Sequence, residues 1–463
     1  RTGRLLALLA MLERIIPSSS RLEKFIRRWD PDLVMVSPLI DAASDQVDLI
    51  KSARRLGLPT AACIASWDNL TNKGLLRIQS DAVMVWNAVQ KAEAVEFHRA
   101  AAEQVVITGA QPFDRWFKRK VSSSRQQFTS RVGLPDDRPF ILFAGSSGFI
   151  SESYAELTFV RRWISALRAV PNPNIQSVGV LIRPHPYNTV AWEEAELEEE
   201  LGAVSVWPRQ RYNAVDESAR ETYFDSLYHS AVVVGINTSA MLEAAIVGRP
   251  VLSILAPEFE ATQEGTLHFH YLLPEHGGCV RVAHDFDEHI RQLVFVLENP
   301  EIVKQETRRF VTTFIRPNGL DRASTPVMAD AVEHVAQRGQ MVDEIIPWWG
   351  SPGRAFLLVV SAVAGLVSWG SAMPRRWQRV QQTGRRVVHR VRKRIAKGVR
   401  YFVREVKHSE RFVVRSVRRL GRVTRRVRLD KFGRGIVRIF RRGRYRAAMF
   451  FRHGTAGDPD TDG

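Results

Sequence analysis

Residues 232–255 constrain the fold more than any other stretch of the chain. The β-branched run over 232–234 is typical of a strand buried on both faces, and a second apolar run covers 251–255. Between them the pattern predicts a polar turn and a helix over 240–247, with Ser239 as its N-cap. We therefore expect a βαβ unit of a parallel sheet, in which ligands bind beyond the carboxyl ends of the strands.

The rest of the body repeats this alternation of apolar strands and amphipathic helices in two series. This predicts an α/β protein with two Rossmann-like domains and a cleft between them. Residues 118–137 break the apolar rhythm and are expected to connect the two domains, and a helix at 324–337 is expected to close the second series. Strands are expected at 33–37, 60–66, 82–86 and 105–108 in the first series and at 140–144, 178–182, 203–206, 232–234, 251–255 and 279–282 in the second.

The same patterns divide the chain into four parts. Residues 1–120 are expected to form the first Rossmann-like domain, and since the chain starts at Arg1 within a helical pattern, we expect the first strand of that domain to be missing. Residues 121–340 are expected to form the second domain. An apolar segment over 341–376 and an Arg-rich helical tail over 377–463 follow.

The charge of the chain is concentrated in the tail. The whole sequence has 67 Lys and Arg against 49 Asp and Glu, a net charge of +18. Residues 374–452 contain 29 of these basic residues and three acids, and residues 453–463 contain three Asp, which leaves 38 basic and 43 acidic residues in 1–373. The body is thus slightly acidic, so a basic surface that could bind an anionic partner is expected only in the tail. Two cysteines, Cys63 and Cys279, lie among apolar neighbours and predict reduced, buried thiols.

Polar residues follow three strands of the second series and form candidate anion-binding loops. After the strand at 140–144, the Ser146, Ser147 and Gly148 turn offers amides and hydroxyls that can converge on phosphate, although it is equally a simple turn. Arg183 and His185 each precede a proline, which favours a fixed guanidinium and imidazole against a diphosphate; the alternative is a structural arginine. The third loop contains Asn237, Thr238 and Ser239, with Glu243 one turn into the following helix.

These motifs resemble those of the two-domain GT-B glycosyltransferases. More narrowly, they are similar to bacterial surface-polysaccharide transferases and CDP-glycerol glycerophosphotransferases, which have an Arg-x-His-Pro segment, here Arg183 to Pro186, and a polar turn before a Gly-Arg-Pro-Val segment, here 237–251. The stretch 105–114 resembles the end of the N-terminal domain in those enzymes and in nucleotide-sugar epimerases. The resemblance covers about residues 30–335. It implies that the second domain binds a nucleotide-activated donor, a UDP-sugar or a CDP-polyol, and that Glu243 accepts hydrogen bonds from its ribose.

The chain departs from this family at the polar turn. Asn237-Thr238-Ser239 stands where the glycerophosphotransferases usually have an aspartate and paired serines, so the donor remains open.

A polar loop over 66–74 marks the first domain as the acceptor side of the cleft. An inverting transferase needs a base to take the proton of the acceptor hydroxyl, and Asp68 is the carboxylate at the right end of a strand, with Asp41 as second choice. The alternative is that these residues only build a turn. The other residues of this loop that we expect to face the acceptor are Trp67, Asn69, Asn72 and Lys73.

Three histidines are also candidates for the site. His185 and His268 are expected to take part in catalysis with Asp68. His268 and His270 are two residues apart, and a strand over 265–270 would place both on one face. Neither has a partner at metal-ligand spacing, so we expect hydrogen-bonding histidines, no metal and no cofactor.

The C-terminal region points to a membrane. Residues 355–374 carry no charge, tryptophans lie near both ends, and about twenty such residues suffice to span a bilayer. A span, an interfacial hairpin and a helix buried against the body remain open. In the tail, valines recur about every 3.5 residues among arginines, which favours an amphipathic helix on an anionic membrane surface over binding to nucleic acid. We therefore expect residues 355–452 to hold the protein at the cytoplasmic side of the membrane.

Together these features favour a transferase of cell-envelope polysaccharide biosynthesis. It would move a sugar or polyol-phosphate group from a nucleotide-activated donor to a surface-polymer or lipid-linked acceptor. Two alternatives remain open: an enzyme like the UDP-sugar 2-epimerases, and a non-catalytic anion-binding scaffold docked on a membrane.

Overall fold

The computed structural model describes residues 2–40, 44–212, 216–342 and 349–357. The chain forms two compact units, one of Ser18–Glu344 and one of Arg1–Pro17 with Ile345–Gly463. In the second of these, Arg354 donates a hydrogen bond to the carbonyl of Ile15, the last residue of helix α1 (Thr2–Ile15). Among the described helices, none combines the length and the apolar character that a bilayer crossing requires. The greater part of the predicted apolar segment, and the whole basic tail, lie outside the described residues.

The N-terminal sheet of the unit Ser18–Glu344 has four parallel strands, as predicted. Their order in the sheet is β1-β2-β3-β4, and Ala61 of β2 pairs with Ala82 of β3. Buried apolar side chains of these strands and of the neighbouring helices form its core. The elements are β1 (Val34–Val36), β2 (Thr60–Cys63), β3 (Ala82–Val85), β4 (Val105–Ile107), α2 (Ser20–Trp29), α3 (Gln46–Arg55) and α4 (Ala88–Glu96), followed by α5 (Asp114–Lys118).

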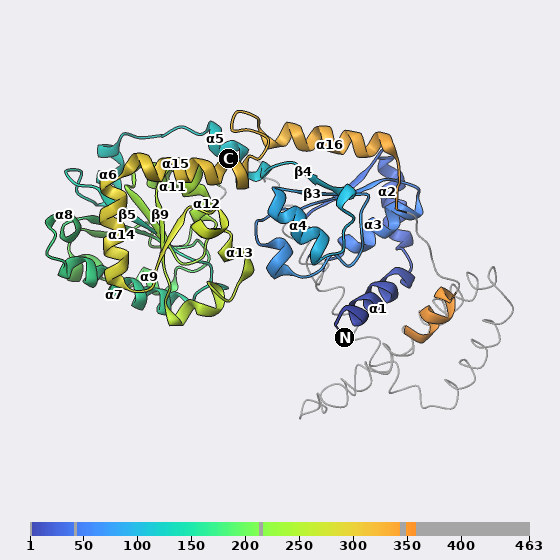
Figure 1. Cartoon of the computed structure of the whole chain (residues 1–463), viewed down its shortest axis with the longest axis horizontal. Helices are drawn as coiled ribbons and strands as arrows, with labels where there is room; N and C mark the ends of the chain where they lie inside the picture. Colours follow the sequence, from blue (N-terminus) through green and yellow to red (C-terminus); the bar gives the residue numbers. More distant parts are fainter. Residues whose placement is uncertain (1, 41–43, 213–215, 343–348, 358–463) are drawn as a thin grey trace, which may run out of the picture. The chain divides into compact units, whose positions relative to one another are not determined.

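The C-terminal sheet has six parallel strands in the order β10-β9-β8-β5-β6-β7. The chain runs outward from β5 in one direction and then returns to place β8 on its other side, so β5 and β8 are neighbours without being consecutive. Figure 1 shows the helices around this sheet. The strands are β5 (Phe140–Ala144), β6 (Gly179–Arg183), β7 (Val204–Val206), β8 (Val232–Gly235), β9 (Val251–Ile254) and β10 (Val280–Ala283). The helices are α6 (Arg125–Val132), α7 (Ser153–Ala169), α8 (Pro173–Gln176), α9 (Val190–Glu193), α10 (Leu197–Leu201), α11 (Glu217–His229), α12 (Ala240–Ile246), α13 (Leu267–His270), α14 (Phe286–Glu298), α15 (Pro300–Phe310) and α16 (Ser324–Arg338).

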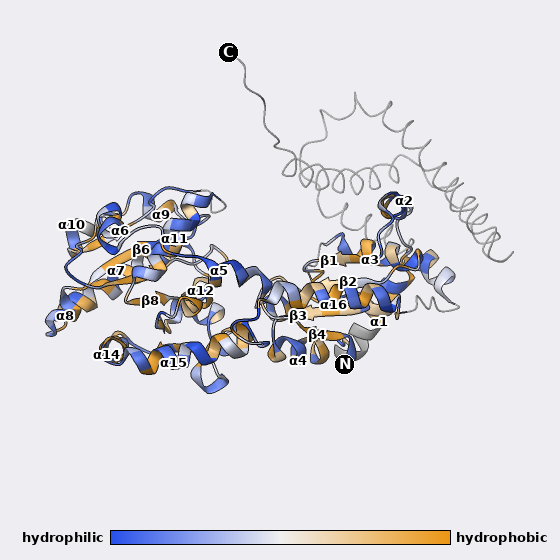
Figure 2. Cartoon of the chain, turned by 90° about the horizontal axis from the view of Figure 1, so that it is seen from above, coloured by the Kyte–Doolittle hydropathy of each residue, from blue (hydrophilic) through white to orange (hydrophobic). Residues whose placement is uncertain are grey.

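Both faces of the C-terminal sheet are buried, which explains its unbroken apolar strands. In β5, Phe140, Leu142 and Ala144 pack into the cluster that contains side chains of α6, α11, α12 and α15. Ile141 and Phe143 point the other way, into the cluster built with α7 and α14. Since side chains alternate along a strand, a strand covered on both sides must be apolar throughout. Figure 2 shows these hydrophobic strands enclosed by helices that carry both colours.

Two sequence predictions about element placement are wrong. Residues 118–137 are more than a connection, because they include α6, whose Phe128 is buried and stacks on Phe140 at 6.0 Å between ring centroids. Helix α16 does not close the C-terminal series; it packs on β2 of the N-terminal sheet. The amphipathic pattern of a helix shows that one face is buried but not which sheet buries it.

The chain passes between the two sheets twice, and Asp114 joins the two passages. Its carboxylate accepts hydrogen bonds from the backbone amides of Ser324 (2.9 Å) and Thr325 (2.6 Å) at the start of α16. It also pairs with Arg316 at 2.9 Å. Beyond α16, the amides of Met341 and Val342 donate to Asp81 at 2.7 Å, so the ordered body extends past residue 340.

Candidate functional site

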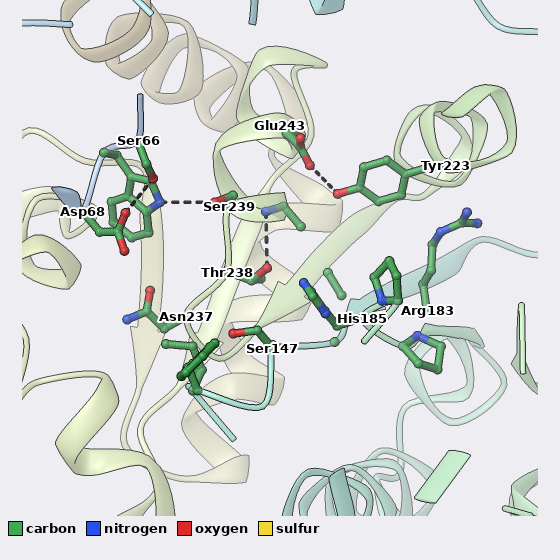
Figure 3. Close-up of a pocket in the computed structure, with 18 of the residues that line it drawn as sticks. Ser66, Asp68, Ser147, Arg183, His185, Tyr223, Asn237, Thr238, Ser239 and Glu243 are labelled. Carbon is green, nitrogen blue, oxygen red and sulfur yellow. Dashed lines mark hydrogen bonds between the residues drawn. The ribbon is translucent and has the colours of Figure 1, made fainter. Parts of the chain in front are cut away.

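A pocket of about 660 Å³ opens where β5 and β8 lie side by side and their loops diverge. In doubly wound sheets this switch point is where ligands bind, because the loops after the two strands run to opposite sides and leave a crevice. The loops after β5, β6 and β8 line the pocket, and the loop after β2 of the N-terminal sheet contributes its other wall. The strand-end loops named from the sequence therefore do meet (Figure 3).

The loop after β5 contributes Ser147 but not Ser146. Ser146 is fully buried, its backbone amide donates to Glu156 at 2.8 Å, and it does not line the pocket. The prediction that both serines face a ligand is wrong for Ser146, because the turn alternates its side chains between core and pocket. A Cβ at Gly145 would lie 3.0 Å from the backbone nitrogen of His185, so any side chain there would press on the loop after β6.

Arg183 ends β6 and lines the pocket from a buried position. Its side chain stands among the rings of Trp207, Tyr212 and Tyr223, with guanidinium-to-centroid distances of 5.2–5.5 Å. The carbonyls of α11 lie 3.5 Å from its terminal nitrogens, and Nε has no hydrogen bond among the described residues. Burial lowers the pKa of the guanidinium. No carboxylate of the described residues contacts this buried cation, which makes it a strong candidate to bind an anion.

His185 follows Arg183 by two residues and lines the same wall. Its Nδ1 accepts a hydrogen bond from the amide of Tyr187 at 3.3 Å. Because an accepting Nδ1 carries no proton, this contact assigns the proton of the neutral ring to Nε2. Burial lowers the pKa of His185, so near neutral pH the ring is uncharged.

The polar turn after β8 lines the pocket, but its side chains already have protein partners. Ser239 precedes α12 without a side-chain capping bond, contrary to the prediction. Its hydroxyl instead accepts a hydrogen bond from the indole of Trp67 at 3.3 Å, while Thr238 accepts from the amide of Ala240 at 3.4 Å (Figure 3). Asn237 donates to the carbonyl of Thr262. The turn thus joins the two walls of the pocket.

Glu243 lies one turn into α12 and lines the pocket, as predicted. The hydroxyl of Tyr223 donates a short hydrogen bond to its carboxylate (Figure 3). Burial raises the pKa of Glu243, the Tyr223 hydrogen bond and the charge of Arg115 oppose that rise, and the resulting pKa is about 7. Near neutral pH both the charged and the neutral form of this carboxyl group are therefore populated.

The loop after β2 contains Ser66 and continues into a π-helical turn, Asn69–Lys73. Asp68 is held there by the Ser66 hydroxyl at 2.6 Å and by Lys73 at 3.3 Å, and it faces the pocket. Asn69 also borders the pocket, but its side chain closes the turn by accepting from the amides of Ala65 and Ser66. Trp67 and Asn72 line the pocket as expected.

The paired arrangement of His268 and His270 is wrong. Residues 267–270 form the short helix α13 and not a strand, so the two histidines point in different directions. His268 is buried in the pocket wall, with Nδ1 3.2 Å from the hydroxyl of Thr71 and Nε2 3.4 Å from Asn237. Burial lowers its pKa, opposed by nearby Asp68. His270 contacts the carbonyl of Glu264 and does not line the pocket.

Several pocket residues were not anticipated from the sequence, among them Arg115, Arg119 and Tyr223. Arg115 and Arg119, at the start of α5 and just after its end, enter the pocket from the passage between the sheets, and Tyr223 enters from α11. Arg119 is paired with Glu217 at 2.9 Å. The only signal for the arginines was their place directly after the motif at 105–114, and Tyr223 carried no signal because it lies within a helix.

The charge of the pocket wall is strongly positive. It contains five basic side chains and two carboxylates. The basic residues are Lys73, Arg115, Arg119, Arg183 and Arg220, and the acidic ones are Asp68 and Glu243. Asp41, the second candidate base, lies outside the described residues. In the part of the chain that the structure describes, no group of three or more His, Cys, Asp and Glu side chains is arranged to hold a metal ion. Cys63 and Cys279 are free and buried.

No family model and no curated protein matches the chain. Similar solved structures include UDP-GlcNAc 2-epimerase from Neisseria meningitidis bound to UDP-GlcNAc, with 16% identity over 68% of this chain and 80% of that one, at a TM-score of 0.43. A glycosyltransferase from Rickettsia africae has 9% identity over 70% and 81%, at 0.44. A variant of the wall teichoic acid polymerase TagF has 14% identity over 56% and 59%, at 0.38. These are GT-B-type structures, the class that the sequence resembles; at such scores the likeness assigns no activity to this chain.

Proposed function

We propose that the protein is a transferase that moves a sugar or polyol-phosphate group from a nucleotide-activated donor to a surface-polymer or lipid-linked acceptor. The observation that carries this proposal is the pocket at the switch point, whose wall has five basic side chains against two carboxylates. Its volume of about 660 Å³ is within the usual range for small-molecule sites, roughly 300–1,000 Å³. A nucleoside diphosphate linked to a sugar or polyol has the size and the negative charge that such a wall favours.

The donor diphosphate is placed beside Arg183, with Ser147 and His185 on the neighbouring loops. A buried guanidinium without a carboxylate in contact is costly, and a phosphate that meets it would offset that cost. Nε2–H of His185 is available to donate a hydrogen bond to the same group. Glu243 is placed at the ribose, where a carboxylate can accept from hydroxyls.

Asp68 is placed on the acceptor side as the general base. When the acceptor oxygen forms its bond to the transferred group, the bond from that group to the nucleotide breaks, and Asp68 takes the hydroxyl proton. Ser66 and Lys73 fix its two oxygens, so the carboxylate is oriented before substrate arrives. Among the described residues, His268 is the other candidate base, because its lowered pKa keeps a neutral ring available. No metal or cofactor enters this proposal.

The test is to incubate the full chain with UDP-sugars and CDP-polyols, with and without polyol-phosphate or lipid-linked acceptors, and to analyse the products. Transfer that requires the acceptor is the expected result. Epimerised sugar nucleotide in the absence of acceptor would replace the transferase proposal with an epimerase. Binding of nucleotides without any turnover would instead support a non-catalytic scaffold.

A further inference from the structure

We propose that Tyr223 is a positioning residue that fixes the orientation and the charge of Glu243 for recognition of the donor's ribose diol. This inference rests on the proposed function, since it concerns the same pocket. Neither the strand-end loops nor the family motifs contain Tyr223, which reaches the pocket from the middle of α11.

The ring of Tyr223 is held in place on two sides. The edge of Trp116 meets it at 5.7 Å between centroids and 85° between planes, and the guanidinium of Arg183 lies 5.2 Å from its centre. Its hydroxyl donates to Oε2 of Glu243. Among the described residues this is the one hydrogen bond that Glu243 receives through its side chain, so Oε1 remains for a ligand.

In this pair Tyr223 is the hydrogen-bond donor and Glu243 is the acceptor. Burial and the neighbouring Glu243 raise the pKa of Tyr223 well above 10, so the phenol keeps its proton and acts as donor. Burial raises the pKa of Glu243 and the Tyr223 hydrogen bond partly offsets this rise, so that the resulting pKa is about 7. Removing the hydroxyl should therefore raise the pKa of Glu243 further and leave it neutral at pH 7.

The other elements packed on α12 bring one further charge to Glu243. Arg115 of α5 lowers its pKa. Helix α15 packs on α12, and its Phe310 lies in the same apolar cluster as the α12 side chains, while strands β8 and β9 contribute uncharged side chains. Tyr212 and Arg183 act on Tyr223 and not directly on Glu243.

A charged Glu243 can accept hydrogen bonds from a ribose diol, whereas a neutral one gives up part of that capacity. The affinity for a ribonucleotide ligand should therefore rise as the pH increases through the pKa of Glu243. Tyr223 determines the pH at which the affinity rises, and it orients Oε1 of Glu243 toward the ligand. A 2′-deoxyribonucleotide, which lacks one of the two hydroxyls, should gain less from the same change.

The experiment titrates the full chain by calorimetry with UDP-glucose, CDP-glycerol and 2′-deoxy-UDP-glucose between about pH 6 and 8, a range centred on the pKa of Glu243. These diphosphate diesters have no phosphate proton that titrates in this range, so the ligand does not obscure the protein. Tyr223→Phe removes only the hydroxyl. Tyr228→Phe is the matched control, because Tyr228 lies on the same helix and stacks on Phe224 at 6.1 Å without lining the pocket.

We expect the Tyr223→Phe affinity for the ribonucleotide to fall about tenfold at pH 7 and to recover in part at higher pH. Its preference over the deoxy ligand should shrink. Tyr228→Phe should match the wild type, and Glu243→Gln should lose the pH dependence. Equal affinity and an equal pH profile in Tyr223→Phe and wild type would overturn the inference.

A second readout separates this inference from the proposed function. The Glu243 carboxyl can be followed in the free protein by carbon-13 NMR, with its signal assigned by its absence in Glu243→Gln. We expect the titration of this carboxyl to move to higher pH in Tyr223→Phe. If it moves but none of the nucleotides binds the wild type, the Tyr223–Glu243 coupling stands and the donor proposal fails. If it does not move, the positioning role is wrong whatever binds.

Discussion

The basic residues of the pocket differ in whether another side chain neutralises them. Lys73 pairs with Asp68, and Arg119 pairs with Glu217. Arg115 lines the pocket, and the described residues offer it neither a hydrogen bond nor an ion pair. The charge of Arg115 lowers the pKa of Glu243, so Arg115 lies near the proposed ribose site. An unneutralised arginine at this position is available to a ligand.

Arg115→Gln should weaken donor binding by about 1 kcal/mol, the value expected for an exposed ion contact. Arg119→Gln is the matched control at the residue that directly follows α5, and it should have a smaller effect because that guanidinium already has a carboxylate partner. Calorimetric titration of both variants with the tightest nucleotide measures the difference. Equal losses in the two variants would mean that pairing with Glu217 does not matter for binding.

Asp68→Asn should reduce turnover by about 10²–10⁴ while leaving donor affinity nearly unchanged. The amide keeps the size of the side chain but cannot take the acceptor proton. The measurement is kcat under saturating acceptor, together with the donor dissociation constant. Near-normal kcat would transfer the base role to His268 or Asp41.

The sequence identified the loops of the site more reliably than the side chains that act in it. Polar residues after apolar strands are visible as motifs, so the loops of Arg183, Asn237 and Asp68 were found. Whether one residue of such a turn points inward depends on partners far along the chain, as with Ser146 and Glu156. The presence of Tyr223 and Arg115 in the pocket could not be predicted, because the sequence of a helix does not show which pocket its side chains reach.

The two chain segments that pass between the sheets are joined to each other, and this connection stabilises the walls of the pocket. The carboxylate of Asp114 accepts from Ser324 and Thr325 and pairs with Arg316. Burial opposes its ionisation, but the hydrogen bonds from Thr325, Ser324 and Arg316 together lower the pKa of Asp114 below the usual 3.8. The carboxylate is thus stabilised as the cap of α16.

Asp114→Ala should lower the free energy of unfolding by about 3 kcal/mol, because it leaves the buried Arg316 and the α16 amides without their acceptor. Asp330→Ala is the control on α16, where an exposed pair at 4.0 Å should contribute less than about 0.5 kcal/mol. Since the folded pKa is below the unfolded one, the Asp114 contribution is fully present above pH 3.8 and is lost as the pH falls through the folded pKa. Denaturant unfolding at pH 7 and pH 3 tests both statements, and a wild-type advantage that persists unchanged well below the folded pKa would contradict the second.

Strands were predicted well because each is a continuous apolar run with a local signal. Helix α16 was assigned to the wrong sheet, although its position in the sequence was correct. Its partners lie more than 200 residues away in the chain: Asp114 accepts from its first residues, and the Sγ of Cys63 lies 3.8 Å from the sulfur of Met328. The periodicity of a sequence shows that a helix has a buried face. It does not show which surface covers that face, because the covering residues lie far away in the sequence.

At the scale of the whole molecule, charge divides the chain into a slightly acidic body and a strongly basic tail. The tail lies outside the described residues, so its membrane role stays a prediction. A chain that ends at Glu344 keeps Met341 and Val342, whose amides bind Asp81, and should fold and bind nucleotide.

The full chain should sediment with vesicles of anionic phospholipid, and the chain that ends at Glu344 should not. Binding of the isolated basic region should fall as salt rises toward about 1 M, where the Debye length is roughly 3 Å. Tight binding of the full chain to RNA or DNA at physiological salt, without vesicle binding, would reassign the tail.

The central claim is that the pocket holds a nucleotide diphosphate against Arg183. The direct measurement is calorimetric titration of the wild type and Arg183→Met with UDP-sugars and CDP-polyols, alongside thermal unfolding. Methionine keeps an apolar stem among the rings of Trp207, Tyr212 and Tyr223 but removes the unneutralised charge, so stability should hold or increase. The account predicts that at least one nucleotide binds the wild type and that Arg183→Met loses about 1.5–3 kcal/mol of affinity with an unchanged or higher Tm. No binding by the wild type, or equal affinity in a folded Arg183→Met variant, would contradict it.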